Sequence, residues 1–430
     1  MIARNLYQFA SAMAARIAPP LLALSGVVAT AARAQTPSAD GAAARTVSTS
    51  FTYTGELAAD VAGGARRGAT YVGAAALQLT VRLDRLASWP GAQLFIFGLA
   101  THGGAPSDQV GDVQGVNNLQ ARPGVRLEEI WLQQNLFENR VSLLAGRYDL
   151  NTEFYRLQSA ALFTNSSFGM GPELTQSGVA GPSVFPNTAV GMRVDFKPSR
   201  NVVWRAAVFD GVPVDRPGGG IHLFAPEDGA LLAGEVALLS RPDTGRALRD
   251  RRFMIGRGAA RPYADKLALG AWYYTGRFPD VADTLVTSTP LTHRGSRGAY
   301  IIGDHTVWSG RPSSPVALSA FAQLGVGDSR VNQIGGYFGS GVTLTGPFAG
   351  RPDDELGLAV AGALMGSHFR RAQPAAEEHV SAEITVEVTY LAQAISRLSV
   401  QPDLQWVIHP GGTRALSNAL VPGLRIALAY

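Results

Sequence analysis

The chain has 430 residues, of which 37 are basic and 33 are acidic, and its formal net charge is +4. Apolar residues make up 46% of the sequence, which excludes a disordered chain because such a content can supply a buried core. Cysteine is absent, which excludes a disulfide scaffold and thiolate metal sites.

The first 34 residues have the features of a secretory signal peptide. They contain three arginines, no acidic residue, an apolar stretch from Leu21 to Ala29 and a small-x-small site at Ala32-Arg33-Ala34. A membrane anchor is the alternative, but the apolar stretch is shorter than the ~18–20 residues of a spanning helix. Removal of residues 1–34 lowers the net charge from +4 to +1, which argues against a nucleic-acid partner. Residues 35–47 are predicted to form a flexible tail.

From about residue 48 onward, apolar and polar side chains alternate with a period of two. Between Val380 and Tyr390 every even position is apolar, whereas the odd positions carry Ser, Thr, Glu383 and Glu387. The last segment repeats this pattern, with Arg425 between two apolar neighbours. Successive side chains of a strand point to opposite faces, so each segment predicts a strand that is apolar on one side and polar on the other.

Sixteen such segments follow one another, and no stretch of comparable length has a helical period. They lie at residues 48–57, 69–85, 91–102, 125–137, 141–150, 187–197, 201–210, 230–240, 265–276, 297–309, 314–326, 331–345, 354–366, 380–391, 396–408 and 420–430. The predicted fold class is therefore all-β, with residues 48–430 as a single domain.

The connections between these segments alternate in length. Short ones follow even-numbered segments at residues 86–90, 138–140, 198–200, 310–313 and 392–395, and long ones follow odd-numbered segments at 103–124, 151–186, 211–229 and 277–296. Short periplasmic turns, long outer loops and an even strand number are typical of outer-membrane barrels. Two connections depart from the rule, because 241–264 is long and 327–330 is short.

These patterns predict a transmembrane antiparallel β-barrel of about 16 strands in the bacterial outer membrane, in contact with outer-membrane lipid. An open sheet edge cannot satisfy its backbone groups in lipid, so the sheet must close. A ring of this size is too wide for side chains to fill and holds water, in which inward-facing charges stay hydrated. A homotrimer fits this shape, although no residue pattern specifies one.

The connection at 151–186 is unusually apolar for a surface loop. It contains several aromatic residues, including Phe154 and Phe168, which have little reason to face water. Folding back into the barrel would bury them and narrow the lumen, and Asn151 and Asn165 would then take part in the constriction. A lid packed on the barrel mouth is the alternative.

The sequence contains no usual catalytic signature. The phosphate-binding Gly-Lys-Ser/Thr loop, the His-Glu-x-x-His motif and the Gly-x-Ser-x-Gly elbow are all missing, so we expect no enzyme, no metal and no cofactor. The arginine-rich stretch 241–261 could bind anionic lipid or polysaccharide, but a solvated turn is the favoured interpretation.

Several runs resemble the carbohydrate-selective porins of the OprB type. They are Gly146–Phe154, Leu162–Gly169, Lys266–Gly276, Leu398–Gly412 and Val421–Arg425, and the Pro-Asp-Leu-Gln run at 402–405 is the most specific. The resemblance covers roughly residues 48–430 and implies a sixteen-stranded outer-membrane channel for small sugars, without catalysis or cofactor. The long 241–264 connection and the terminal Tyr430 depart from it.

A sugar channel needs paired hydrogen-bond donors and acceptors, aromatic faces for stacking and only weak binding. The candidate pore-lining residues are Arg147, Asp149, Glu129, Trp131, Arg193, Arg205, Glu383 and Arg425. Three alternatives stay open at this point: a porin for organic acids or other small solutes, a barrel enzyme of the outer-membrane lipase type, and a structural or adhesive barrel with a plugged lumen.

Overall fold

In the computed structural model, which describes residues 46–213, 224–225, 228–240, 265–310, 316–373 and 380–430, each of the sixteen predicted segments overlaps one strand. The strands of the ring are β1 (Val47–Asp60), β3 (Gly68–Arg82), β4 (Ala92–Gly103), β5 (Gly124–Leu136), β6 (Val141–Tyr148), β7 (Ala189–Ser199), β8 (Val202–Asp210), β9 (Ala230–Leu239), β10 (Lys266–Pro279), β11 (Thr292–Ser309), β12 (Ala317–Gly327), β13 (Ile334–Thr345), β14 (Glu355–Met365), β15 (Ala382–Ile395), β16 (Leu398–Ile408) and β17 (Ser417–Ala429). The predicted all-β fold is confirmed.

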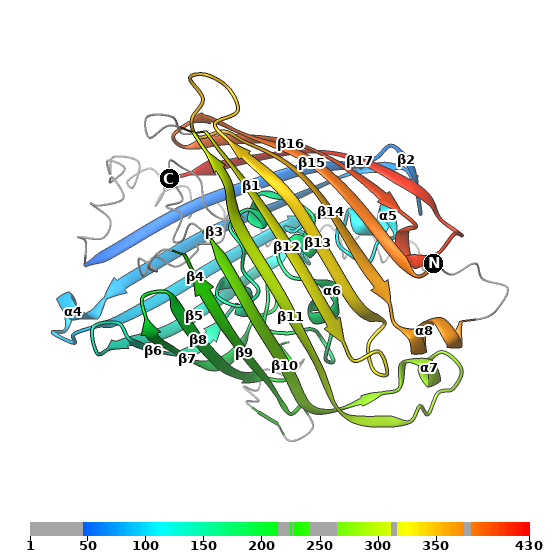
Figure 1. Ribbon diagram of the computed structural model, residues 1–430, viewed down its shortest axis with the longest axis horizontal. Coiled ribbons are helices and arrows are strands. Elements are labelled where there is room, and N and C mark those ends of the chain that lie inside the picture. Colours follow the sequence, from blue (N-terminus) through cyan, green and yellow to red (C-terminus); the bar gives the residue numbers. More distant parts are fainter. Residues whose placement is uncertain (1–45, 214–223, 226–227, 241–264, 311–315, 374–379) are drawn as a thin grey trace, which may run out of the picture. The chain divides into compact units, whose positions relative to one another are not determined.

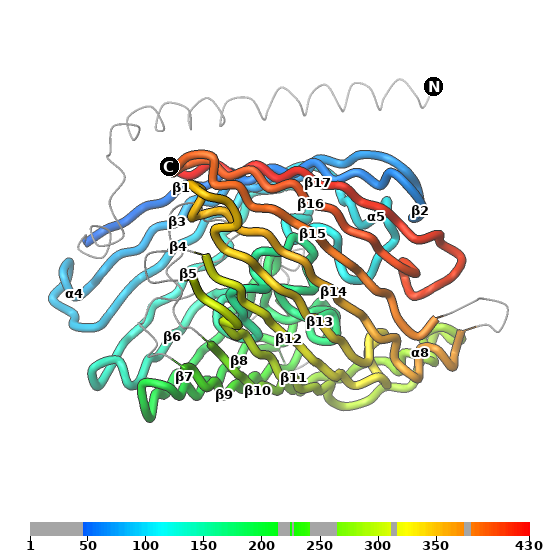
Figure 2. The backbone as a smooth tube through the Cα atoms, turned by 45° about the horizontal axis from the view of Figure 1, so that its top comes forward, coloured from blue at the N-terminus to red at the C-terminus, as the bar shows by residue number. Residues whose placement is uncertain are grey.

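The sheet closes on itself. Each strand pairs antiparallel with its neighbour in the chain, and β17 returns to pair with β1, with Leu428 opposite Tyr53. The first strand, in blue, accordingly lies beside the last, in red (Figure 2). A three-residue strand, β2 (Ala62–Gly64), adds to β17 at one end without entering the ring. Sixteen strands therefore form a closed barrel with no free edge.

Short helices lie in the connections (Figure 1). They are α4 (Leu83–Leu86), α5 (Ser107–Val110), α6 (Pro172–Thr175), α7 (Val281–Thr284) and α8 (Ser367–Ala372), with the 3₁₀ turns η1 (Leu150–Thr152), η2 (Ala160–Leu162), η3 (Ser166–Phe168) and η5 (Pro410–Gly412). No helix in the described residues is long and apolar enough to cross a membrane.

The two faces of the barrel wall differ as the alternation predicts. Along β10, Leu267 and Leu269 are 50% and 62% exposed, whereas Ala268 and Trp272 between and beyond them are buried. Large exposed apolar side chains recur on this outward face around the ring. Such a surface would be unfavourable in water but is compatible with the hydrocarbon interior of a bilayer.

The connections at the two ends of the strands differ in length. Turns such as residues 137–140 and 200–201 lie at one end, which we call the short-turn end, and long connections such as residues 104–123 and 149–188 lie at the other. The connection after β12 is short, as the sequence suggested, and the backbone oxygen of Arg330 in it accepts a hydrogen bond from Val281 of α7. The 241–264 connection and the predicted signal peptide lie outside the described residues.

Candidate functional site

The interior of the barrel holds two long connections, which we call L2 (residues 104–123) and L3 (residues 149–188). Their residues contact the inward face of strands that are distant in sequence. Figure 1 shows α6, which belongs to L3, and α5, which belongs to L2, among the strands of the ring. The lumen is therefore defined by these two loops as much as by the barrel wall.

Carboxylates on the wall hold the backbone of L3. Glu235 of β9 accepts a hydrogen bond from the N–H of Tyr155 at 2.9 Å, and Asp304 of β11 accepts from the N–H of Gln158 at 2.8 Å. Glu387 of β15 accepts from the N–H groups of Thr164 and Asn165 at 2.6 and 3.0 Å. A loop inside the barrel cannot pair its backbone with a sheet, so these side chains satisfy donors that would otherwise be buried without partners.

Amide side chains of the wall bind the loop carbonyl groups. Gln323 of β12 donates to the oxygen of Phe168 at 3.0 Å, and Gln401 of β16 donates to the oxygen of Leu162 at 2.8 Å. Gln405 donates to the oxygen of Val116 in L2 at 2.8 Å. Amides donate where carboxylates accept, so the wall supplies donors to loop carbonyl groups and acceptors to loop N–H groups.

Apolar packing also holds L3 against the barrel wall. Phe163 and Phe168 pack on each other with ring centroids 5.0 Å apart, and both lie against Phe321 of β12. Tyr155 packs on Tyr300 of β11 at 4.3 Å. Each of these aromatic side chains is buried. Burial of such rings is worth about 1.5–3 kcal/mol each, which explains why this loop is apolar in sequence.

L2 is bound in the same way and is joined to L3. Glu383 of β15 accepts hydrogen bonds from the N–H groups of Val113 and Gln114 at 2.9 and 3.1 Å. Between the loops, the N–H of Asn118 donates to the oxygen of Thr164 at 2.9 Å. Sequence reasoning missed this loop, although its apolar residues Val113, Val116 and Leu119 carry the same signal as those of L3.

A charge cluster lies where L3 meets β7, β8 and β9. Arg193 binds Glu153 of L3 at 2.6 Å, and Arg205 binds Asp195 through two hydrogen bonds of 2.7 and 2.9 Å. Lys266 binds Glu235 at 3.1 Å on the far side of the cluster. Arg205 also lies over the ring of Phe154, 5.5 Å from its centroid. Three cations face three carboxylates, so the cluster has no formal net charge.

The short-turn half of the β3–β5 wall is different, because its inward-facing side chains are less buried in the described structure than those beneath L2 and L3. Inward-facing Thr80, Phe95, Trp131 and Gln133 are only half-buried there. The rings of Phe95 and Trp131 stack at 4.9 Å and 26°, and the Trp131 indole N–H donates to Glu129 at 2.9 Å. This wall presents aromatic faces and amide groups to the lumen and reaches the charge cluster through Gln133, which accepts from Arg193.

The predicted pore-lining residues other than Arg147 fall into three groups. Trp131, Glu129, Arg193 and Arg205 lie together on the inward face of β5, β7 and β8. Glu383 and Arg425 also face inward but are buried, because L2 covers them: Arg425 binds Glu56 at 2.6 Å and donates to Asn118 at 2.7 Å. Asp149 begins L3 and accepts from the N–H groups of Asn151 and Phe185, so it shapes the loop.

Arg147 requires a correction. Its register partner on β5 is Ile130, which is 39% exposed on the outward face, so Arg147 does not face the lumen with the others. Its Nε donates instead to Thr188 at 2.8 Å. The sequence placed Arg147 beside Asp149 at the root of L3, but β6 ends at Tyr148, so Asp149 does not continue the alternation of the strand and its side chain turns into the loop to accept from Asn151.

The four residues predicted for the constriction are all buried in L3. Asn151 donates to the oxygen of Gly169 at 3.0 Å and ties the two arms of the loop together. Asn165 caps η3 and donates to Gln405 at 3.1 Å. Phe154 and Phe168 are core residues of the loop. These side chains thus determine the shape of L3, and Phe95 is a lumen-facing residue that the sequence did not single out.

We expect the stability of the folded protein to depend on pH through Glu173 of α6. Burial raises its pKa from 4.5 to about 7; Tyr155 donates to its Oε1 at 3.0 Å, and its Oε2 has no hydrogen-bond partner in the described part of the chain. Between these two pH values, the carboxyl group of Glu173 keeps its proton in the folded protein but releases it in the unfolded chain. The free energy of unfolding therefore falls by roughly 3 kcal/mol as pH rises from 4.5 to 7, and this contribution is flat above that window.

We expect Glu173→Gln to remove this part of the pH dependence. Urea unfolding in detergent at pH 5 and pH 8 should show a smaller difference for the variant than for the wild type. Asp112 of L2, whose pKa burial raises to about 6, contributes to both proteins and cancels in the comparison. An identical pH dependence in the two proteins would contradict the prediction.

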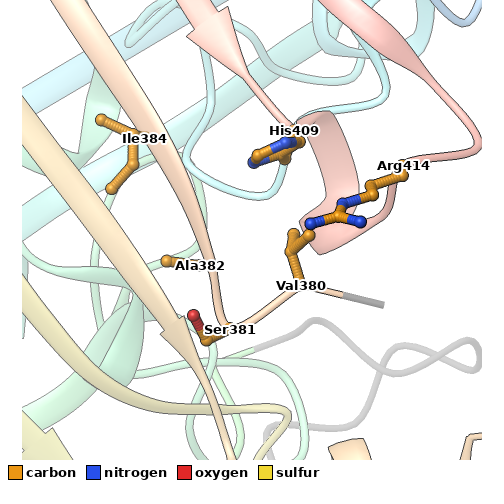
Figure 3. Close-up of a pocket in the computed structure, with 6 residues that line it drawn as sticks. All are labelled: Val380, Ser381, Ala382, Ile384, His409 and Arg414. Atoms are coloured by element: carbon orange, nitrogen blue, oxygen red, sulfur yellow. The ribbon is translucent and has the colours of Figure 1, made fainter. Parts of the chain in front are cut away.

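One of the surface hollows lies outside the barrel, at the long-loop end of β15 and β16 (Figure 3). It measures about 530 Å³ and is lined by Val380, Ser381, Ala382, Ile384, His409 and Arg414. None of the predicted site residues belongs to it.

The structure is a closed barrel of sixteen strands with an apolar outer face, and two loops held by polar side chains of the wall lie in its interior. This arrangement defines an outer-membrane channel. A family comparison identifies residues 66–430 as a carbohydrate-selective porin of the OprB family, so the chain belongs to this family. It is a channel protein and not an enzyme.

Individual relatives agree with this membership. The chain is 26% identical over 414 residues to Porin B of Pseudomonas aeruginosa, covering 88% of this chain and 86% of the relative. A high-pH structure of Pseudomonas putida OprB has a TM-score of 0.76 at 21% identity, covering 90% of this chain and 94% of that one. The low-pH structure of the same protein has a TM-score of 0.54 at 17% identity. These structural similarities support the fold.

Proposed function

We propose that small neutral sugars diffuse passively along the β3–β5 wall, between this wall and the inner loops. The observation that carries this proposal is the half-buried stack of Phe95 and Trp131, bordered by the amide of Gln133. Aromatic faces can stack on the apolar faces of sugar rings, while the amide of Gln133 offers hydrogen bonds to hydroxyl groups. Binding at such an open surface is weak enough to permit release.

The charge cluster favours neutral solutes over organic acids. Its cations are each paired with a carboxylate, so an anionic solute would find no unbalanced positive charge along this part of the lumen. In this proposal L3 forms the constriction, because it reaches from its root between β6 and β7 to contacts with β9, β11, β12, β15 and β16.

Replacement of Trp131 by alanine tests the sugar path. We expect the half-blocking concentration of a maltooligosaccharide in a planar bilayer to rise about 5- to 30-fold, as loss of a stacking contact of ~1–2 kcal/mol implies. Ion conductance should change little. Trp406, an exposed outward-facing indole, supplies the control Trp406→Ala. Equal sugar block in wild type and Trp131→Ala would contradict the path, and equal swelling of liposomes in sugars and size-matched organic acids would contradict the selectivity.

Two further proposals come from the sequence. Residues 1–34 act as a cleaved signal peptide, which sequencing the N-terminus of the mature protein would test. Assembly into a homotrimer stays a prediction, which the mass of the detergent-solubilised channel would decide.

A further inference from the structure

The outward face of β10 and β11 carries three exposed arginines at its long-loop end. Arg277 and Arg294 are directly paired across the two strands, and Arg297 is paired with Tyr273. The next residue after Arg277, Phe278, is buried in the interior core, which places Arg277 on the outside of the barrel. Like charges in opposed positions repel each other, so this arrangement stabilises nothing within the sheet.

These arginines keep their charge available. In the described part of the chain none of the three side chains forms an ion pair with a carboxylate. The acidic residues of the neighbouring loops have other partners: Asp280 binds His293 at 2.8 Å, Asp283 accepts a hydrogen bond from the N–H of Leu291 at 3.1 Å, and Asp328 binds Arg330 at 2.7 Å. Arg330 and, as a weaker contribution, the charge of Arg297 lower the pKa of Asp328. A compact basic cluster that forms no direct ion pair with these carboxylates therefore lies on the outside of the barrel wall.

An apolar groove runs across the wall beside this cluster. Its floor is a row of small residues in direct register on four strands, Ala206, Gly234, Ala271 and Ala299. Larger outward-facing side chains border the floor, among them Trp204, and the groove has a volume of about 530 Å³. Small residues between large ones leave a furrow that a flexible apolar chain can fill.

The groove leads directly to the arginines. Its floor pair Ala271–Ala299 is followed, two residues along the same strands, by the pair Tyr273–Arg297. Two residues of a strand span only ~7 Å, so the guanidinium of Arg297 can reach above the groove. Tyr273 is 39% exposed and occupies the position of an aromatic residue at the boundary between lipid and water.

We propose that this surface binds a phosphorylated glycolipid of the outer leaflet. Its phosphate lies against Arg277, Arg294 and Arg297, and one acyl chain lies in the groove. Guanidinium groups match phosphate oxygens in both charge and geometry, and arginines at a membrane surface attract anionic head groups. A second copy of the chain related by a two-fold axis fits less well, because that contact would bring two arginine clusters together.

Binding of lipid A to the purified full-length channel in detergent tests the proposal. We measure the dissociation constants of bisphosphorylated lipid A and of its dephosphorylated form by native mass spectrometry. Neutralising the cluster in Arg277→Gln/Arg294→Gln/Arg297→Gln should weaken binding of the phosphorylated lipid roughly 100-fold. Filling the groove in Ala271→Trp should weaken it roughly tenfold. The control Arg66→Gln/Arg67→Gln/Arg140→Gln removes three exposed arginines from connections other than L2 and L3 and should bind as the wild type does.

Each result bears on the proposal. Heat-modified electrophoretic migration verifies that every variant is folded, and sugar flux through the channel should be unchanged in all of them. Equal loss in the two triple variants would overturn the site, because general charge would then explain binding. Inorganic phosphate that competes as well as lipid A would overturn the role of the groove. Oligomers that form without lipid and disappear in Ala271→Trp would assign the face to a second copy instead.

Discussion

Replacing Glu387 by alanine is expected to raise the single-channel conductance and to make the open-channel current noisy. The carboxylate is fully buried and accepts two backbone hydrogen bonds from L3, at Thr164 and Asn165. Without it both N–H groups lose their partner, and each buried unsatisfied group costs about 1–3 kcal/mol. The segment around η3 should therefore leave the wall part of the time and widen the constriction.

Planar-bilayer recordings in KCl measure this effect directly. Asp108→Ala is the matched control, because this carboxylate lies in L2 but is exposed. We expect the control to conduct as the wild type does, and Glu387→Ala to show at least a twofold larger or fluctuating conductance. A quiet current of wild-type size from the folded Glu387→Ala channel would show that L3 does not set the constriction.

The barrel could be predicted from the sequence because its lipid environment imposes the pattern. One face of every strand must be apolar and the other polar, so the period of two at residues 380–391 locates β15 (Ala382–Ile395) within a few residues. Closure of the sheet follows from the physical cost of an edge in lipid.

The contacts that hold L2 and L3 against the barrel wall could not be predicted in this way. Asn165 binds Gln405 across a sequence separation of 240 residues, and no local pattern encodes such a pairing. The same limit applies to Glu383 and Arg425, whose inward direction was predicted but whose burial depends on L2. Phe95 was overlooked because apolar residues flank it on both sides, which hides the alternation.

Replacing Arg205 by alanine is expected to destabilise the channel and to increase its preference for cations. The guanidinium is 15% exposed and binds Asp195, whose side chain is 7% exposed, through two hydrogen bonds. Its Nη1 also donates to the backbone oxygen of Glu153 at 2.6 Å, so it links L3 to the wall. Removing one partner of a largely buried ion pair costs about 3–5 kcal/mol, because the other charge stays behind.

A change in ion selectivity would distinguish the loss of the Arg205 charge from a simple loss of packing. Arg205→Ala leaves the cluster with one more carboxylate than cations, which should shift the reversal potential in a KCl gradient toward cation selectivity. Arg205→Ala/Asp195→Ala restores the balance, so its selectivity should return toward that of the wild type, and its unfolding midpoint in urea should lie above that of the single variant. Arg370→Ala, which removes an exposed arginine from α8, should change neither quantity. If the single and double variants share one reversal potential, the cluster does not govern ion passage, and the solute path must lie elsewhere in the lumen.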